Sequence, residues 1–426
     1  MKKICVVGLG YVGLPLAYEL AKGFEVIGYD VNAKRLEELR SGHDSTKELT
    51  KGQLQSVNID YVETLEFGVG DVYIVTVPTP INSEMKPDLS PLTSSCEYLA
   101  KLLKKGDLVL FESTVFPGCT RDVCVPILER GSGFKLNTDF GVGYSPERIN
   151  PGDKINTIRK VKKLVSASSD YYLQQSKAIY KSVVDVGVVV CDSIEIAEAA
   201  KVIENTQRDL NIAFMNEVSQ LFDKLSIPTL DVISAASTKW NFLEFYPGLV
   251  GGHCISIDPY YIIDCAEKQN VDLKIIKSAR FINEYTTKRI VEKVHELSAH
   301  MYCEDNKFKC SIHIEGLTFK ENCPDVRNSK IFNVIDDLLE DGYEVTVNDQ
   351  WLPDIVKQDL IGSGYQFSCP VDTDIYILAL GHDYMRTDHF VENLMNKSLS
   401  EMGKIIDIKG VLRSFEVARD RVAWEL

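Results

Sequence analysis

The sequence predicts an α/β protein with two Rossmann-like doubly wound parallel-sheet domains joined by a central long-helix segment. Three observations carry this prediction: a strand, glycine turn, helix and strand at the N-terminus; a run without glycine or proline over residues 193–225; and a second alternation of strands and helices after residue 309. The 426 residues are too many for one hydrophobic core and suit two or three domains. We expect domains at residues 1–192, 193–302 and 303–426, with the polar segment 303–309 as a linker.

Composition excludes several classes of protein. The net charge of −15 disfavours nucleic acid or anionic membrane as the main partner, and no apolar run is long enough to insert into a membrane. The start of the chain, MKKICVVGLG, breaks into glycines and is better interpreted as a strand than as a signal peptide. The eleven cysteines form no CxxC pair, so we expect a cytoplasmic protein with neither disulfides nor a bound metal.

The N-terminal glycines form a dinucleotide fingerprint in its full context. An apolar strand runs into Gly8-Leu9-Gly10-Tyr11-Val12-Gly13, a helical pattern follows, and a second strand ends on Asp30. Gly8 makes the tight turn, Gly10 admits a pyrophosphate, and Gly13 lets the helix pack on the strand. Asp30 can accept from ribose hydroxyls and would repel a 2′-phosphate, which favours NAD over NADP. The alternative is a glycine turn that serves packing alone.

Polar side chains follow three later strands. The strand at 71–77 leads to Thr79, the strand at 107–113 leads to Thr114, and the segment 140–152 presents Glu147 and Arg148. Ligands of doubly wound sheets bind beyond the carboxyl ends of the strands, which makes these residues binding candidates. Capping hydroxyls and a solvated Glu-Arg pair are the alternatives.

The long helix over 193–225 carries Lys201, Asn205 and Arg208 at spacings of four and three, which places them on one face. Two cations and an amide suit an anionic or hydroxyl-rich ligand, although a solvated face would have the same pattern. A second long helix is expected at 273–297. Two long helices between α/β units commonly supply a dimer interface, so we expect a homodimer or higher homo-oligomer.

A glycine-rich loop at 247–261 carries the candidate nucleophile. Cys254 follows Gly251-Gly252 and a histidine, and Asp258 stands four residues later. Glycines let the backbone approach a ligand closely, and an exposed thiol there could attack a substrate. A buried, unreactive cysteine is the alternative. In the C-terminal domain, Lys320 and Arg327 occupy the place of a glycine fingerprint and suit a diphosphate.

As a set and in this order, seven segments resemble motifs of the UDP-glucose/GDP-mannose dehydrogenase family: GLGYVGLPLA, VPTP, ESTV, YSPERINPG, EAAKVIENTQRD, GGHCISIDPYY and FKENCPDVRNS. The resemblance spans essentially the whole chain and is nearest to UDP-N-acetylhexosamine 6-dehydrogenases of bacterial capsule and O-antigen pathways. It implies NAD-dependent oxidation of a nucleotide sugar at C6 to the uronic acid. One departure from the family pattern is Glu315, in a strand that usually ends on glycine.

The resemblance also implies roles for individual residues. Cys254 matches the nucleophile, Lys201 the general acid/base and oxyanion-stabilising lysine with Asn205 beside it, and Asp258 and Glu147 the acids that position water, with Thr114. Substrate-contact positions are Arg148, Ile149, Lys201, Asn205, Arg208, Gly251, Phe319 and Lys320, with Lys239 and Lys409 as looser candidates. Cofactor-contact positions are Gly8, Gly10, Tyr11, Val12, Gly13, Asp30, Arg35, Thr79, Thr114 and Arg327, the last from a neighbouring subunit or domain.

Oxidation of a primary alcohol to a carboxylate removes four electrons, so the expected mechanism uses two NAD molecules in sequence and a Cys254 thiohemiacetal and thioester. UDP-glucose and UDP-N-acetylmannosamine are alternative substrates. A two-electron dehydrogenase of the hydroxyacid type is the rival enzyme, and it would have no use for a nucleophilic cysteine. An NAD-responsive binding protein would leave Cys254, Lys201 and Asp258 unexplained.

Overall fold

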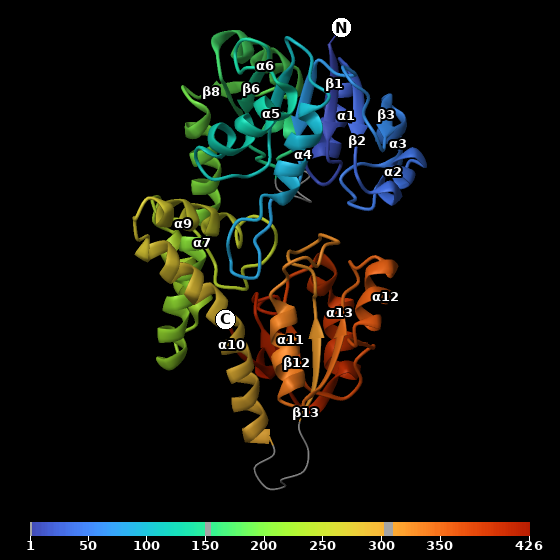
Figure 1. The fold of residues 1–426 in the computed structure, drawn as a ribbon. Coiled ribbons are helices and arrows are strands. Elements are labelled where there is room, and N and C mark those ends of the chain that lie inside the picture. Colours follow the sequence, from blue (N-terminus) through green and yellow to red (C-terminus); the bar gives the residue numbers. More distant parts are fainter. Residues whose placement is uncertain (1, 150–154, 302–309) are drawn as a thin grey trace. The chain divides into compact units, whose positions relative to one another are not determined.

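The computed structural model describes residues 2–149, 155–301 and 310–426 (Figure 1). The chain forms two compact units, Met1–Asn205 with Ile257–Asp272, and Thr206–Ser256 with Leu273–Leu426. The segment 193–302, expected as a central domain, is shared between the two units, and the three expected domain boundaries stay a prediction. The expected linker at 303–309 lies outside the described residues.

The first unit is built on an eight-stranded sheet in the order β3-β2-β1-β4-β5-β6-β7-β8. Its strands are β1 (Lys3–Val7), β2 (Glu25–Tyr29), β3 (Ile59–Val62), β4 (Val72–Val75), β5 (Leu108–Phe111), β6 (Gly141–Tyr144), β7 (Lys163–Ala167) and β8 (Val188–Val190). Neighbouring strands pair in parallel, except that β6 and β7 pair antiparallel. The helices are α1 (Gly13–Ala21), α2 (Ala33–Arg40), α3 (Lys51–Gln55), α4 (Ser90–Ala100), α5 (Val125–Ser132), α6 (Asp170–Val183) and α9 (Asp258–Lys268).

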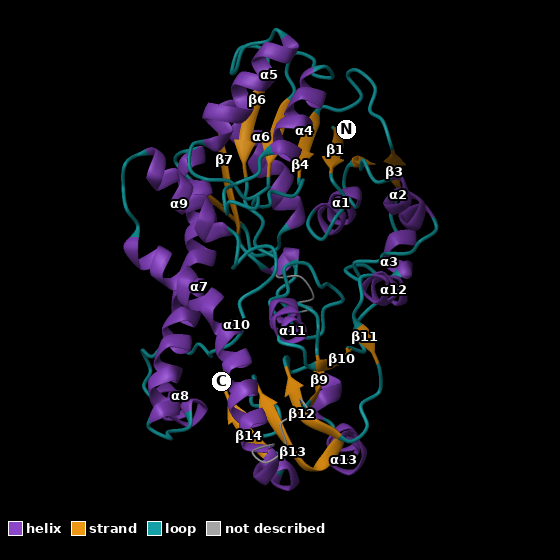
Figure 2. Ribbon diagram, turned by 60° about the horizontal axis from the view of Figure 1, so that its bottom comes forward, coloured by secondary structure: helices purple, strands orange, loops and turns teal. Residues whose placement is uncertain are grey.

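Helices cover both faces of this sheet, as the apolar strand sequences predict (Figure 2). Ile4 and Val6 of β1 belong to a core cluster with residues of α1 and α6. Cys5 and Val7 belong to a second cluster with residues of α4 and α5. Successive side chains of a strand point to opposite faces, so each face of the sheet is buried by its own set of helices. The doubly wound prediction is confirmed for this unit.

The second unit has a six-stranded, wholly parallel sheet in the order β11-β10-β9-β12-β13-β14. Its strands are β9 (Ser311–Glu315), β10 (Glu344–Asn348), β11 (Gln366–Phe367), β12 (Thr373–Leu378), β13 (Leu399–Asp407) and β14 (Val422–Glu425). The helices are α8 (Thr229–Ser237), α10 (Lys274–Met301), α11 (Ile331–Glu340), α12 (Asp354–Gly362) and α13 (Asp388–Asn393). Core clusters again lie on both faces, so the second Rossmann-like fold is confirmed.

The long helix α7 (Ile194–Lys224) forms as predicted and passes from the first unit into the second. Ser193 caps it, because its hydroxyl oxygen accepts the Ile196 N–H at 3.3 Å. Within the second unit, the Asp209 carboxylate of α7 accepts from Arg280 at 2.5 Å and from Asn283 at 2.7 Å, both on α10. Buried polar contacts therefore fix how these two helices pair.

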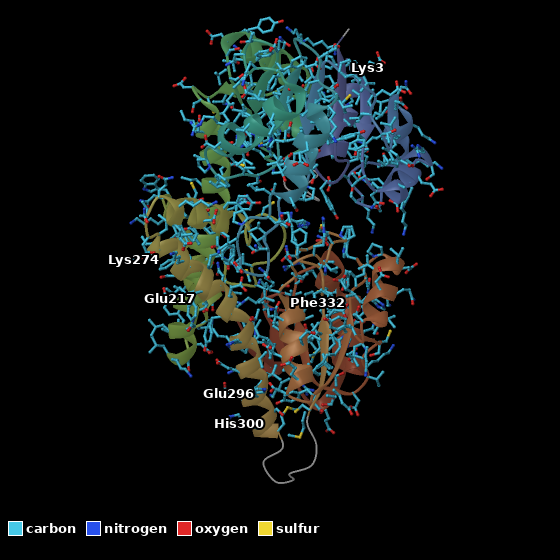
Figure 3. The ribbon with its side chains drawn as sticks, in the orientation of Figure 1. Lys3, Glu217, Lys274, Glu296, His300 and Phe332 are labelled. Atoms are coloured by element: carbon cyan, nitrogen blue, oxygen red, sulfur yellow. The ribbon has the colours of Figure 1, made fainter. Side chains whose placement is uncertain are left out.

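The exposed surfaces of α7 and α10 carry both charged and apolar side chains. Glu217 on α7 and Lys274 and Glu296 on α10 are exposed charges, and all three are labelled in Figure 3. Phe214 and Leu221 on α7 are also exposed, at 54% and 57%. No helix within the described ranges combines the length and apolar character needed to cross a membrane.

The two units repeat the same turn after their first strand. In the first, Gly8 adopts φ +96°, and the next N–H, that of Leu9, donates to Asp30 Oδ2 at 2.8 Å. In the second, Gly316 adopts φ +99°, and the Leu317 N–H donates to Asp349 Oδ2 at 2.7 Å. Each acid stands directly after the second strand of its sheet. The departure at Glu315 does not disturb this turn, because Glu315 is buried and accepts from Tyr384 at 2.6 Å and Tyr376 at 3.1 Å.

Candidate functional site

The fingerprint turn of the first unit is shaped to hold a pyrophosphate. A Cβ at Gly13 would lie 1.9 Å from the carbonyl oxygen of Gly8, so only glycine allows α1 to start this close to the turn. A Cβ at Gly10 would meet nothing within 4 Å, so the space beside this residue is open. Tyr11 and Val12 then lead into α1, whose first N–H groups suit an anion.

Thr76, which the sequence motifs did not single out, holds the backbone of this turn through its hydroxyl group. Its hydroxyl lies 3.0 Å from the carbonyl oxygen of Val7 and 2.8 Å from that of Gly8, and a Cβ at Gly13 would lie 2.4 Å from the same hydroxyl. The only hint in the sequence was a threonine at the end of an apolar strand.

Asp30 and Arg35 flank the turn in different ways. Asp30 is half-buried, and its carboxylate accepts the N–H groups of Leu9 and Asn32, which leaves lone pairs for ribose hydroxyls. Arg35 is buried, and it donates to the Leu9 carbonyl oxygen at 3.0 Å and to Asp44 at 2.8 Å. The guanidinium therefore supports the turn from the protein side. Its expected contact with adenosine stays a prediction.

Thr79, Thr114 and Glu147 follow β4, β5 and β6, which are neighbours in the sheet, so the structure places all three at the same edge. Tyr261 of α9 donates its hydroxyl to the carbonyl oxygen of Thr79 at 2.9 Å and ties this edge to α9. Arg148 beside them pairs with Glu204 at 2.7 Å and donates to the Lys162 carbonyl oxygen at the same distance.

Glu147 is buried above a charged network that the motifs did not reveal. One of its oxygens accepts the Ile149 N–H, and the other is buried and has no hydrogen-bond partner within the described part of the chain. Behind it, the fully buried Glu112 accepts from Lys163 at 2.5 Å and from Tyr180 at 2.6 Å. Burial raises the pKa of Glu112, Lys163 opposes that rise, and the charge of Glu147 adds to it.

Asn205 and Asp258 come together in the first unit, and Lys201 precedes Asn205 on the same helix. Asn205 of α7 donates its amide to the Asp258 carboxylate at the start of α9, and both side chains are almost fully buried. Lys201 lies one helical turn before Asn205 and is 5% exposed.

Cys254 lies in the second unit, on a loop packed against the segment that follows β9. A Cβ at Gly252, which has φ +84°, would lie 2.6 Å from the Phe319 ring. A Cβ at Gly251 would lie 2.5 Å from the Asn328 carbonyl oxygen, and the amide of Asn328 donates to the Gly252 carbonyl oxygen at 3.2 Å. The two glycines thus permit a contact that brings the half-buried Cys254 to the segment carrying Phe319 and Lys320.

His253 beside the thiol is held neutral at neutral pH. Its Nε2 lies 2.9 Å from Asp325, which Arg327 also binds at 2.7 Å. Burial and the charge of Arg327 lower the pKa of His253 to about 4 against the opposing effect of Asp325. His253 therefore supplies no positive charge to Cys254. Of the looser candidates, Lys409 reaches this loop, since its Nζ would lie 2.6 Å from a Cβ at Gly248, and Lys239 is exposed.

The structure divides the predicted residues between its units. The first unit holds the fingerprint, Thr79, Thr114, Glu147, Arg148, Ile149, Lys201, Asn205 and Asp258, and the second holds Arg208, Gly251, Cys254, Phe319, Lys320 and Arg327. No group of three histidine, cysteine or acidic side chains in the described residues is placed to hold a metal ion.

Comparison with known proteins covers the whole chain. Models of the UDP-glucose/GDP-mannose dehydrogenase family match its NAD binding domain to residues 2–184, its central domain to 195–285 and its UDP binding domain to 313–414. Protein CapL of Staphylococcus aureus is 43% identical over 100% of both chains, and the UDP-N-acetyl-D-glucosamine 6-dehydrogenase of Pseudomonas aeruginosa is 45% identical over 82% of this chain and 83% of its own. The structure of a UDP-D-ManNAc dehydrogenase from Pyrococcus horikoshii has a TM-score of 0.86 at 26% identity and covers 99% of this chain and 98% of its own.

Glu198 opens the EAAKVIENTQRD segment but was not among the predicted site residues, and it generates a prediction about the pH dependence of stability. It is fully buried on α7 and accepts the N–H groups of Gly118 and Thr120 at 2.6 and 2.9 Å, on the loop that follows Thr114. Burial raises its pKa from 4.5 to about 7. Between these values the folded state keeps a proton that the unfolded state has lost, so Glu198 lowers the free energy of unfolding as pH rises through this window.

Glu198→Gln removes this titration. The free energy of unfolding of the natural protein relative to the variant should therefore fall from pH 4.5 to pH 7, by up to about 3 kcal/mol, and level off above pH 7. Urea unfolding followed by circular dichroism at several pH values measures the difference. Glu217→Gln, at an exposed position of the same helix, is the matched control. If the free energies of unfolding of the natural protein and Glu198→Gln change with pH in parallel, the raised pKa of Glu198 is contradicted.

Proposed function

Because the chain belongs to the UDP-glucose/GDP-mannose dehydrogenase family, we propose that it oxidises the C6 hydroxyl of a UDP-N-acetylhexosamine, GlcNAc or GalNAc, to the uronic acid. The family makes it an NAD-dependent UDP-sugar dehydrogenase. The observation that supports the finer reaction is the packing of the Cys254 loop against Phe319, made possible by Gly251 and Gly252. The substrate class is supported by 45% identity to a UDP-N-acetyl-D-glucosamine 6-dehydrogenase.

The first unit fits NAD. Gly8 and Gly13 form the turn, the open space at Gly10 admits the pyrophosphate, and Asp30 has lone pairs left for the ribose. NAD supplies the hydride acceptor for each oxidation. Asp30 would also repel the 2′-phosphate of NADP, which supports NAD as the cofactor. Thr79 and Thr114 would contact it, which their position at the same sheet edge supports.

Cys254 would hold the sugar carbon between the two oxidations. Its thiolate adds to the C6 aldehyde, giving a thiohemiacetal. Loss of the second hydride from that carbon gives a thioester, and water cleaves it to the carboxylate and the free thiol. A thiol is only a few per cent thiolate at neutral pH, and the neutral His253 does not change that. We therefore assign the charge that stabilises the thiolate and oxyanion to Lys201 and the loop N–H groups.

The remaining candidates take roles around this chemistry. Asn205 orients the Asp258 carboxylate by its hydrogen bond, and Asp258 or Glu147 would position the hydrolytic water. The buried oxygen of Glu147 that no described residue binds is available for this purpose. Arg148, Ile149, Arg208, Gly251, Phe319 and Lys320 would contact the nucleotide sugar, and Arg327 would contact the cofactor from a neighbouring subunit or domain.

A cytoplasmic role in surface polysaccharide biosynthesis completes the proposal. It is supported by the similarity to protein CapL and to UDP-N-acetyl-D-glucosamine 6-dehydrogenases. UDP-N-acetylmannosamine is the second candidate substrate, because a UDP-D-ManNAc dehydrogenase shares the fold along nearly the whole chain. UDP-glucose is a further alternative.

The purified protein should form two NADH per sugar oxidised, because both hydride transfers occur on one carbon. NADH absorbance against product, quantified by mass spectrometry, gives this ratio. Cys254→Ser should abolish uronate formation and leave NAD binding unchanged, since the fingerprint lies in the other unit. Cys191→Ser, at another half-buried thiol, is the control. One NADH per sugar would favour a two-electron dehydrogenase, and full activity of Cys254→Ser would end the proposed mechanism.

Among nucleotide sugars, UDP-GlcNAc or UDP-GalNAc should give the highest kcat/KM with NAD as acceptor. A panel with UDP-GlcNAc, UDP-GalNAc, UDP-ManNAc, UDP-glucose and GDP-mannose, each with NAD and with NADP, measures this preference. A higher kcat/KM for UDP-ManNAc or UDP-glucose would replace the proposed substrate and keep the chemistry.

We expect a homo-oligomer whose interface includes the exposed apolar side chains of the long helices. Phe214 and Leu221 on α7 and Phe281 on α10 are 54%, 57% and 71% exposed, which is unfavourable in water. Leu221→Asp should shift the sedimentation coefficient toward that of a monomer, whereas the exposed Glu217→Gln should leave it unchanged. A natural protein that sediments as a monomer would contradict this expectation.

A further inference from the structure

His382 lies where a Rossmann fold usually leaves room for its ligand. It follows β12 at the carboxyl edge of the second sheet and is fully buried. Its ring stacks between Trp351, at 6.2 Å and 15°, and Tyr384, at 5.4 Å and 14°. A protein side chain thus fills this part of the sheet edge.

The hydrogen bonds of His382 identify its tautomer. The backbone N–H of Asn322 donates to Nδ1 at 2.9 Å, so Nδ1 carries no hydrogen. The hydrogen of the neutral ring is therefore on Nε2, which faces Asp349 Oδ2 at 3.3 Å and the Thr318 hydroxyl at 3.4 Å. The imidazole bridges Asp349 to the backbone of the segment that follows β9.

This segment, residues 317–325, is fastened at several further points. Asp349 also accepts the N–H groups of Leu317 and Thr318 at 2.7 and 3.1 Å. The Thr318 hydroxyl donates to the carbonyl oxygen of Lys320 at 2.9 Å. The Asn322 side chain in turn accepts the Asp383 N–H at 3.1 Å. His382 and Asp349 thus hold both sides of the two residues Phe319 and Lys320.

Asp30 and Asp349 occupy corresponding positions in the two units but make different contacts. Asp30 accepts two backbone N–H groups and stays half-buried, which suits a nucleotide. Asp349 is 3% exposed and accepts the N–H groups of Leu317, Thr318 and Trp351 in addition to facing His382. In the second unit, this acid therefore holds the segment 317–325 in place.

We propose that His382 is a positioning residue which, with Asp349, holds Phe319 and Lys320 in place to bind the nucleotide part of the substrate. The inference rests on the proposed function of these two residues as substrate contacts. We call the contacts of His382 and Asp349 with the segment 317–325 the brace. Phe319 also packs on Gly252, two residues before Cys254, so the brace supports the cysteine loop as well. Loss of the brace should weaken nucleotide binding while NAD binding, in the other unit, stays the same.

Three variants separate the two hydrogen bonds of the ring. In His382→Asn, the amide oxygen can replace Nδ1 as acceptor for the Asn322 N–H. In His382→Gln, the amide nitrogen can replace Nε2 as donor to Asp349. His382→Phe keeps the stacking and loses both bonds. A buried N–H left without an acceptor is costly, so His382→Phe should weaken UDP binding about tenfold or more, and His382→Asn should restore most of it.

The Kd of UDP by isothermal titration calorimetry is the primary measurement, because it needs no turnover. The Kd of NAD should be unchanged in all three variants, and steady-state kinetics should show a larger rise in KM for the sugar than fall in kcat. His389→Phe, at an exposed position in α13, is the matched control. It should bind UDP as the natural protein does.

The outcomes distinguish the brace from the proposed function. If the natural protein binds UDP but oxidises no nucleotide sugar, the proposed function fails and the brace is still tested by UDP affinity. An unchanged UDP affinity in a folded His382→Phe would overturn the brace, as would an equal loss in His389→Phe. If His382→Phe does not fold, equal UDP affinities of His382→Asn and His382→Gln would overturn it.

Discussion

A hydrogen bond from one backbone N–H to one carboxylate shapes the functional edge of both units. In each, a glycine with positive φ follows the strand, and the next N–H donates to the acid after the neighbouring strand. This contact holds the chain in the turn by which it leaves the sheet. In the first unit it places α1 over the turn, and in the second it places the segment with Phe319 and Lys320. The fingerprint residues of the first unit, and Phe319 and Lys320 of the second, follow directly from this turn along the chain.

The side chains around the turn differ between the two units and determine whether space for a ligand remains beside it. In the first unit, Thr76 and Arg35 support the turn from the protein side and leave open space beside Gly10. In the second, His382 fills the corresponding edge, and a cysteine loop packs against the segment beyond it. One fold thereby leaves open space beside its turn in one unit and fills the corresponding edge with a side chain in the other, as expected when function resides in side chains placed on a common framework.

Buried charge is the second recurring feature. Glu112 with Lys163 lies behind Glu147, Glu198 holds the loop after Thr114, and Asp209 with Arg280 joins α7 to α10. Such pairs contribute little net stability compared with apolar packing, but they disfavour every arrangement in which a partner is missing. These buried groups lie next to candidate catalytic residues and between α7 and α10. At these places a small displacement of a side chain or a helix would alter the candidate site most.

The sequence by itself determined the fold class, the fingerprint turn, the long helix over residues 193–225 and the family, because these depend on short-range patterns. Glycine spacing, apolar periodicity and caps such as Ser193 act between residues close along the chain. It also predicted the nucleophile loop at Cys254, from a glycine pair whose packing against Phe319 the structure then explained. The roles of the individual site residues stay predictions.

Only the tertiary structure decided the partners of those residues. Glu112 meets Lys163 across 51 positions, His382 meets Asp349 across 33, and Asn205 meets Asp258 across 53. The sequence shows Glu112 at the end of an apolar strand and offers Asn205 and Asp258 as site candidates, but it does not show which side chains they contact. Which distant side chains meet is set by how sheets and helices stack, and no local pattern encodes that stacking. The sequence thus predicted candidate site residues, whose roles stay predictions, and the packing decided which neighbours contact them.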